Sequence, residues 1–160
     1  EYLHRHRKMI QYFSIFKEVN ARWNYVYDPQ GEDYYSKTSE TINQLEFDDQ
    51  FKGDCDDYSI LIGGLIKSVG GEVRLVRTTV PQSDSSEIGH LYPEVKIGDE
   101  KALDAAIYII KAELFHKESK GKPVFYYKDS DGYIWLNFDY NDTYPGGKYQ
   151  SLIRESALEL

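Results

Sequence analysis

The spacing of apolar side chains changes once along this 160-residue chain, and this change constrains the fold more than any other feature. In residues 2–26, and again after Cys55, apolar residues recur three or four positions apart, as on one face of an amphipathic helix. From Val73 onward apolar and polar residues mostly alternate, which is typical of strands with one buried face. Helices followed in this way by antiparallel strands predict an α+β fold.

Two helices are expected from the first pattern. One spans about residues 2–26 and stops before Asp28-Pro29, and its start is basic although the chain as a whole is acidic. The other begins at Cys55 and ends at Gly70-Gly71, a typical helix C-cap. The sequence shows neither an internal repeat nor a linker, so we expect a single domain over residues 1–160.

The second pattern predicts an antiparallel sheet interrupted by one helical segment. Strands are expected at 73–80, 90–97, 124–128 and 133–140, with a helical insertion at about 98–122. Pro93 lies inside the second of these strands. Because proline cannot donate a backbone hydrogen bond, it predicts an edge position or a bulge there.

Composition excludes several classes of function. The net charge of −8 provides no excess of positive charge to meet a phosphate backbone, so nucleic acid is not expected as a partner. A single cysteine, Cys55, excludes an internal disulfide framework and any multi-cysteine metal site. The acidic stretch 46–57 fits no calcium loop, and no metal or organic cofactor is expected. No apolar run reaches the ~18 residues of a membrane span. The chain begins at Glu1 rather than Met, so the possibility of a membrane anchor upstream is left open.

Cys55 is the candidate nucleophile. Asp54 is a good N-cap residue and places Cys55 at the first position of a helix, where backbone N–H groups lower the pKa of a thiol and can bind an oxyanion. The neighbouring carboxylates Asp54, Asp56 and Asp57 act in the opposite direction. We therefore expect an accessible thiol with a lowered pKa, provided that an imidazolium lies nearby.

Four histidines could supply that imidazole: His4, His6, His90 and His116. His90 differs from the others because it opens a strand, on the same face as Tyr92 and Glu94. A cysteine–histidine pair also needs an acid that orients the ring.

Two carboxylates compete for this orienting role. Asp139 ends an apolar strand between two aromatic residues, whereas Asp104 lies in the helical insertion, where a solvent-facing helix acid is the simpler interpretation. We favour Asp139 and keep Asp104 as the alternative.

Three motifs in this order resemble the transglutaminase-like superfamily. They are Gly-Asp-Cys-Asp-Asp-Tyr at 53–58, Gly-His-Leu-Tyr-Pro-Glu-Val at 89–95 and Trp-Leu-Asn-Phe-Asp at 135–139, and the likeness covers roughly Trp23 to Gly147. The resemblance implies a papain-like core in which the cysteine-bearing helix packs on an antiparallel sheet that carries the histidine and the acid on neighbouring strands.

The resemblance also assigns roles. It implies that Cys55 is the nucleophile, His90 the base and acid, and Asp139 the orienting acid. In compact members the acid follows the histidine closely, as Asp104 would. Here the insertion at about 98–122 separates the two strands that carry His90 and Asp139.

The expected function is cysteine-dependent hydrolysis of amide or peptide bonds through a thioester, with a protein or peptide as the substrate. Two alternatives remain open: transfer of the acyl group to an amine, as in transglutaminases, and a non-catalytic binding or structural module. The presence of Cys55, His90 and Asp139 together favours an enzyme.

Overall fold

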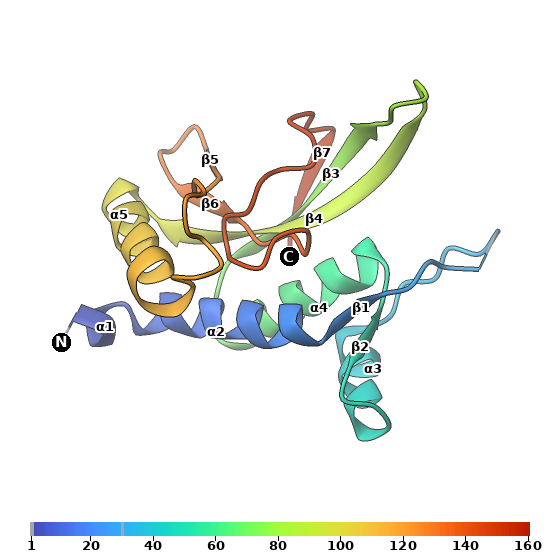
Figure 1. The fold of residues 1–160 in the computed structure, drawn as a ribbon, viewed down its shortest axis with the longest axis horizontal. Helices are drawn as coiled ribbons and strands as arrows, with labels where there is room; N and C mark the ends of the chain where they lie inside the picture. The colour runs from blue at the N-terminus through green and yellow to red at the C-terminus, as the bar shows by residue number, and fades with distance from the viewer. Residues whose placement is uncertain (1, 30) are drawn as a thin grey trace.

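A computed structural model describes residues 2–29 and 31–160, and Figure 1 shows its helices and strands. In chain order the elements are α1 (Tyr2–Arg5), α2 (Arg7–Arg22), β1 (Trp23–Tyr25), α3 (Thr38–Asn43), the 3-10 helix η1 (Gln44–Glu46), β2 (Phe51–Gly53), α4 (Cys55–Ser68), β3 (Val73–Pro81), β4 (Glu87–Gly98), α5 (Glu100–Tyr108), the π-helix η2 (Ile109–Leu114), β5 (Tyr126–Lys128), β6 (Ile134–Asn137) and β7 (Ser156–Glu159).

The main sheet is antiparallel, with the strand order β5-β6-β4-β3-β7. Its centre is the long hairpin of β3 and β4, which pair from Val73↔Val95 to Pro81↔Glu87 and extend beyond the rest of the sheet (Figure 1). Strand β4 therefore has a partner on each side, β3 and β6. A second, two-stranded sheet joins β1 and β2 in parallel.

Helices α2 and α4 lie on one side of the main sheet (Figure 1). Their apolar faces meet the sheet in a single core, in which Phe13, Phe16 and Leu61 are fully buried together with Val95 and Leu136. Each such side chain contributes about 1.5–3 kcal/mol by leaving water. The spacing that predicts the helices from sequence is therefore the spacing of the residues that form this core.

On the other side of the sheet a buried ion-pair network replaces the apolar core. Glu94 of β4, which is 0% exposed, pairs with Arg74 of β3 (2.7 Å) and with Arg154 (2.8 Å). Tyr149 also donates to Glu94, at 2.8 Å. Tyr149 and Arg154 belong to residues 148–155, which we call the C-terminal strap, and Glu94 fixes this strap to the sheet.

The single helix predicted at about 2–26 is wrong in its bounds. The structure has a turn at His6 between α1 and α2, and α2 ends at Arg22. Residues 23–25 form strand β1 instead, because pairing with β2 satisfies their backbone groups and their aromatic side chains suit a strand. Tertiary pairing outweighs the helical spacing of Trp23.

The prediction for Pro93 is also wrong, because β4 is not an edge strand and its irregularity lies between Lys96 and Gly98. Strand β6 ends at Asn137, which pairs with Glu94. The β4–β6 ladder therefore stops before Pro93, and no carbonyl of β6 needs an N–H from this residue. The carbonyl of Pro93 still accepts from the N–H of Phe138 at 3.0 Å. The predicted α+β class, with a cysteine-bearing helix on an antiparallel sheet, is confirmed.

Candidate active site

The start of α4 is built around the cysteine. Asp54 accepts hydrogen bonds from the N–H groups of Asp56 (3.0 Å) and Asp57 (3.4 Å), and Asp57 accepts from the N–H of Asp54 (3.2 Å). This capping box needs a glycine before it, since a Cβ at Gly53 would lie 2.5 Å from the Cβ of Asp57. Cys55 thus occupies the first position of α4, as the sequence predicts, and the cap does not engage its own N–H.

Two side chains in the first turn of α4 attach the helix to the segments that carry His90 and Asp139. Ser59 donates to the carbonyl of Leu91, next to His90, at 3.1 Å, and Tyr58 donates to the carbonyl of Phe138, next to Asp139, at 2.9 Å. The hydroxyl of Tyr58 is buried, so losing its bond would leave a polar group unsatisfied, whereas the hydroxyl of Ser59 also lies 2.7 Å from the carbonyl of Cys55. These bonds bring residues of three distant sequence segments into one place.

His90 and Asp139 form a close buried pair. The Nε2 atom of His90 lies 2.6 Å from Oδ2 of Asp139, and the two residues are only 7% and 3% exposed. The other carboxylate oxygen of Asp139 accepts from the N–H of Tyr140 at 2.8 Å. Asn137 accepts from the N–H of Asp139 at 3.1 Å and so shapes the end of β6. Because Asp139 engages Nε2, Nδ1 is the ring nitrogen left for a thiol.

Asp104 occupies a different environment. It is exposed on α5, and the bonded carboxylate partner of His90 is Asp139. The structure therefore brings His90 together with the acid that the sequence favours, although 49 residues separate the two in the chain.

The surroundings of Cys55 do not lower the pKa of its thiol. Burial, followed by the charges of Asp56, Asp54 and Asp139, raises this pKa to about 12, and a hydrogen bond from the backbone of Leu91 opposes the rise. The sulfur also lies 3.7 Å from Oδ1 of Asp56. The expected lowered pKa is not found, because burial and three carboxylates outweigh the helix N-terminus, although Cys55 is only half-buried.

Tyrosine rings form an aromatic wall beside Cys55. Tyr25 packs against Tyr27 and Tyr140, with ring centroids 4.9 Å and 5.2 Å apart. Burial is the main cause that raises the pKa of both Tyr25 and Tyr140, and a negative charge on Cys55 is a smaller cause for each, which places these rings near the sulfur. Tyr27 is 82% exposed, so this wall reaches the solvent.

Sequence reasoning missed three polar residues at this site. Ser59 lies among the apolar positions of α4, and a buried polar residue there was a readable signal. Tyr58 lies at a position of the apolar helix face, so the sequence did not indicate that its hydroxyl makes a hydrogen bond. Gln150 gave none, because it lies in an irregular segment and its amide nitrogen reaches both His90 Nε2 and Asp139 Oδ2 at 3.1 Å only in the folded chain.

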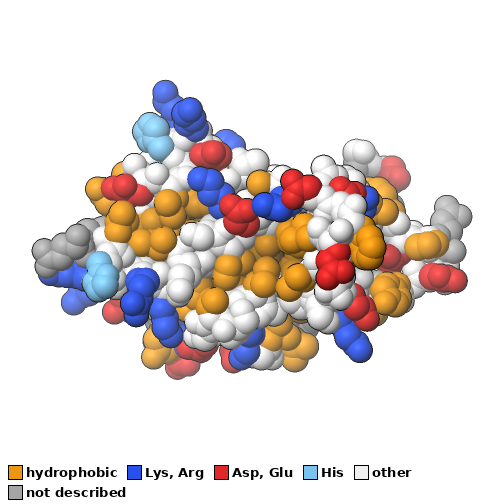
Figure 2. Space-filling view, turned by 90° about the horizontal axis from the view of Figure 1, so that it is seen from below, with side chains coloured by type: hydrophobic (Ala, Val, Ile, Leu, Met, Phe, Trp, Pro, Cys, Tyr) orange, Lys and Arg blue, Asp and Glu red, His pale blue; other side chains and the backbone are white. Residues whose placement is uncertain are grey.

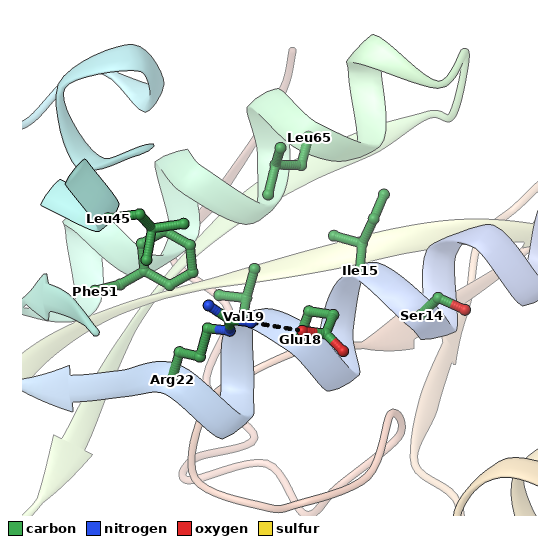
Figure 3. Close-up of a pocket in the computed structure, with 8 residues that line it drawn as sticks. All are labelled: Ser14, Ile15, Glu18, Val19, Arg22, Leu45, Phe51 and Leu65. Carbon is green, nitrogen blue, oxygen red and sulfur yellow. Dashed lines mark ion pairs between the residues drawn. The ribbon is translucent and has the colours of Figure 1, made fainter. Parts of the chain in front are cut away.

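A separate groove lies on the helical side of the molecule. It has a volume of about 400 Å³ and apolar walls from Val19 of α2, Phe51 of β2 and Leu65 of α4. Figure 3 shows these side chains pointing toward one another, with the ion pair of Arg22 and Glu18 (3.5 Å) along the edge. Hydrophobic side chains also gather across the middle of the face seen in Figure 2. None of the three proposed catalytic residues lines this groove.

Within residues 2–29 and 31–160, no group of three or more His, Cys, Asp or Glu side chains is arranged to hold a metal ion. In the same part of the chain, no helix combines the length and the apolar character of a membrane span.

The match to a protein-family model agrees with this architecture. A family model described as the transglutaminase-like superfamily matches residues 11–140. Calcium-bound LapG of Legionella pneumophila is similar over 86% of this chain and 56% of that chain, with 17% sequence identity and a TM-score of 0.49. Another LapG structure from the same organism covers the same shares at 16% identity, with a TM-score of 0.48. The chain thus spans about 56% of the length of these LapG chains. A search of curated proteins gives no match.

Proposed function

Because this chain belongs to the transglutaminase-like superfamily, we propose that it is a cysteine-dependent hydrolase of amide or peptide bonds with Cys55, His90 and Asp139 as its catalytic triad. The observation that carries the proposal is the buried pair of His90 and Asp139, with 2.6 Å between Nε2 and Oδ2. An imidazole oriented in this way by a carboxylate is what thiol-based acyl chemistry requires.

The position of Cys55 supports the proposal further. Its sulfur lies beside the backbone of Leu91, the residue after His90, and the free ring nitrogen of His90 is Nδ1. The N–H of Cys55 stands at the N-terminus of α4, outside the Asp54 cap, where it can donate to an oxyanion.

The raised pKa of Cys55 determines how the reaction begins. The thiol is neutral near pH 7, so Nδ1 of His90 accepts the S–H proton as the sulfur attacks the substrate carbonyl carbon. The C=O electron pair moves to oxygen, which the N–H of Cys55 stabilises. When the C–N bond breaks, the amine leaves with the proton from His90 and a thioester remains.

Water completes the cycle. His90 accepts a proton from the water as its oxygen attacks the thioester carbon, and the C–S bond then breaks. The sulfur recovers the proton, and a carboxylic acid is released. An amine that attacks in place of water would give the transglutaminase outcome. We propose hydrolysis because water is always present and no feature of the described residues marks an amine site.

The test uses the intact protein and an unfolded protein substrate such as reduced, alkylated casein. Incubation with and without a fluorescent primary amine, followed by mass spectrometry, separates the outcomes. Hydrolysis creates new chain ends or converts glutamine to glutamate, whereas acyl transfer adds the mass of the amine. The variants are Cys55→Ala and, as a matched histidine control, His116→Ala, which changes an exposed residue two positions after η2.

We expect hydrolysis products from the wild type and from His116→Ala, and none from Cys55→Ala. Products that persist in Cys55→Ala would remove the cysteine from the mechanism. Amine-bearing products alone would change the reaction to acyl transfer. No products from any form, with an unmodified Cys55, would favour the binding module.

A further inference from the structure

Gln150 of the C-terminal strap covers the His90–Asp139 pair. Its amide nitrogen lies 3.1 Å from Oδ2 of Asp139 and 3.1 Å from Nε2 of His90. The same side chain also makes a hydrogen bond with Tyr140. Gln150 itself is exposed, whereas His90 and Asp139 beneath it are buried, so the amide stands between the pair and the solvent.

The strap is held firmly on both sides of Gln150. Tyr149 donates to Glu94 at 2.8 Å, and Arg154 makes two bonds to the same carboxylate, at 2.8 and 2.9 Å. Glu94 is fully buried in the central strand β4, four residues after His90. The element that carries His90 therefore also fixes the backbone that presents Gln150.

The contacts that join Gln150, Asp139 and His90 determine where the protons lie. An amide NH2 group is a donor only, so the nitrogen of Gln150 can donate to the carboxylate of Asp139. His90 lies 2.6 Å from that same oxygen and must also donate to it, through Nε2–H. In this arrangement the nitrogens of Gln150 and His90 are two donors that share one acceptor. When the ring is neutral, Nδ1 then carries the lone pair that a general base needs.

We propose that Gln150 is a positioning residue that holds the Asp139 carboxylate in place and thereby keeps His90 in the tautomer with its proton on Nε2. The inference rests on the function proposed for Cys55, His90 and Asp139, since the tautomer matters for catalysis only if His90 is the base. Gln150 acts through Asp139 and does not touch the reacting atoms.

The decisive experiment compares the His90 ring in four proteins by long-range 1H–15N NMR, at a pH where the wild-type imidazole is neutral. Gln150→Leu removes the donor, and Gln150→Glu keeps the shape but replaces the donor with a carboxylate. Gln82→Leu is the matched control, because it removes an amide at the β3–β4 turn whose bond is to the carbonyl of Val80. Iodoacetamide labelling of Cys55 at the same pH is a second readout.

We expect a single Nε2–H tautomer in the wild type and in Gln82→Leu. Gln150→Leu is expected to give a mixture of tautomers. Gln150→Glu is expected to hold His90 as the imidazolium, between two carboxylates, at the same pH. Cys55 labelling is expected to fall in Gln150→Leu in proportion to the share of rings whose Nδ1 carries the proton, which is about twofold for an equal mixture of tautomers.

A purely packing role predicts that Gln150→Glu, which has the same shape, behaves as the wild type does. His90 signals that stay unchanged in both Gln150 variants would overturn the inference. If Gln150→Glu does not fold, Gln150→Leu decides. The NMR signals of the His90 ring do not depend on turnover, so the two proposals can fail separately. If the ring responds but the protein hydrolyses no substrate, the positioning role is supported and the proposed function is not. If the protein hydrolyses substrate but the ring does not respond, the proposed function is supported and the positioning role is not.

Discussion

In the proposed mechanism, Cys55 must lose a proton in surroundings that oppose a negative charge. Burial and the carboxylates of Asp54, Asp56 and Asp139 raise the pKa of its thiol to about 12, so the reactive thiolate is scarce near neutral pH. A base that removes the proton during attack therefore matters more here than in a site that holds a preformed thiolate.

This state of the thiol can be checked by labelling with iodoacetamide as a function of pH. The thiolate reacts far faster than the thiol, so above neutral pH the rate is expected to rise about tenfold per pH unit and to keep rising through about pH 10, above the ordinary inflection near 8.5. His90→Ala is expected to reduce the residual labelling at neutral pH, because it removes the proton acceptor. A plateau below about pH 8 would instead indicate a stable thiolate–imidazolium pair.

The orienting acid can be identified with two matched substitutions. Asp139→Asn keeps the shape but removes the charge that pairs with His90, and loss of such an acid costs up to about 10⁴-fold in rate. Asp104→Asn changes an exposed residue of α5 and is expected to leave the rate unchanged and stability within about 0.5 kcal/mol. Hydrolysis rates, or Cys55 labelling where no substrate is yet in hand, measure both. The reverse order of effects would transfer the role to Asp104.

At this scale the sequence predicts much of the candidate site. Cys55, His90 and Asp139 each lie in one of the three motifs at 53–58, 89–95 and 135–139. The structure brings His90 and Asp139 into contact. Gln150 could not be found in this way, since 60 residues separate it from His90 and its contact depends on how the strap folds back. The burial of Cys55 depends equally on tertiary packing.

Strand β4 is the element that links the site to the rest of the fold. It carries His90 near one end and, four residues later, the buried Glu94 that holds two arginines. Breaking a buried ion pair leaves uncompensated charge, which costs far more than losing an exposed pair.

Glu94→Gln is therefore expected to lower the free energy of unfolding by about 3–5 kcal/mol, because Arg74 and Arg154 lose their shared carboxylate. Glu155→Gln is the control: its ion pair with Arg77 is exposed, so a change of at most about 1 kcal/mol is expected. Urea unfolding followed by circular dichroism measures both. Equal small effects would mean that the buried network contributes little.

The elements were predictable where local pattern and tertiary packing agree. The apolar face of α4 and the alternation in β3 and β4 correspond to the core that the structure shows. The helix predicted over residues 23–25 was wrong, because their pairing with β2, a strand about 28 residues further along the chain, cannot be inferred from local spacing. The edge position or bulge predicted at Pro93 was wrong for a similar reason, since a central strand can accept this proline only because β6 ends before it.

The whole molecule contains many buried tyrosines, and this makes its stability sensitive to alkaline pH. Burial raises the pKa of Tyr140 and of Tyr144 to about 12, and it also raises the pKa of Tyr25 and Tyr92. The unfolded chain releases these protons near pH 10, whereas the folded chain holds them. The unfolded state then binds fewer protons, so stability falls as the pH rises above about 10.

Urea midpoints measured between about pH 8 and about pH 11 are expected to show this fall, with Cys55 adding to it from about pH 9. Tyr144→Phe removes one of the groups, and its curve is expected to be shallower, although it also loses the bond to the carbonyl of Pro123. A stability that is flat or rising across this range would show that the tyrosine hydroxyls ionise as easily in the folded chain as in the unfolded one.

Strand β7 has a consequence for self-association. Its four residues pair with Arg74–Arg77 of the nine-residue strand β3 and so occupy part of that outer edge of the sheet. An unpaired edge of this length offers its N–H and C=O groups to any passing strand. A chain shortened before Ser156 would expose the backbone of Arg74–Arg77, and oligomers that grow with protein concentration would then be expected. The last strand thus covers backbone groups of β3 that would otherwise be open to pairing with another chain.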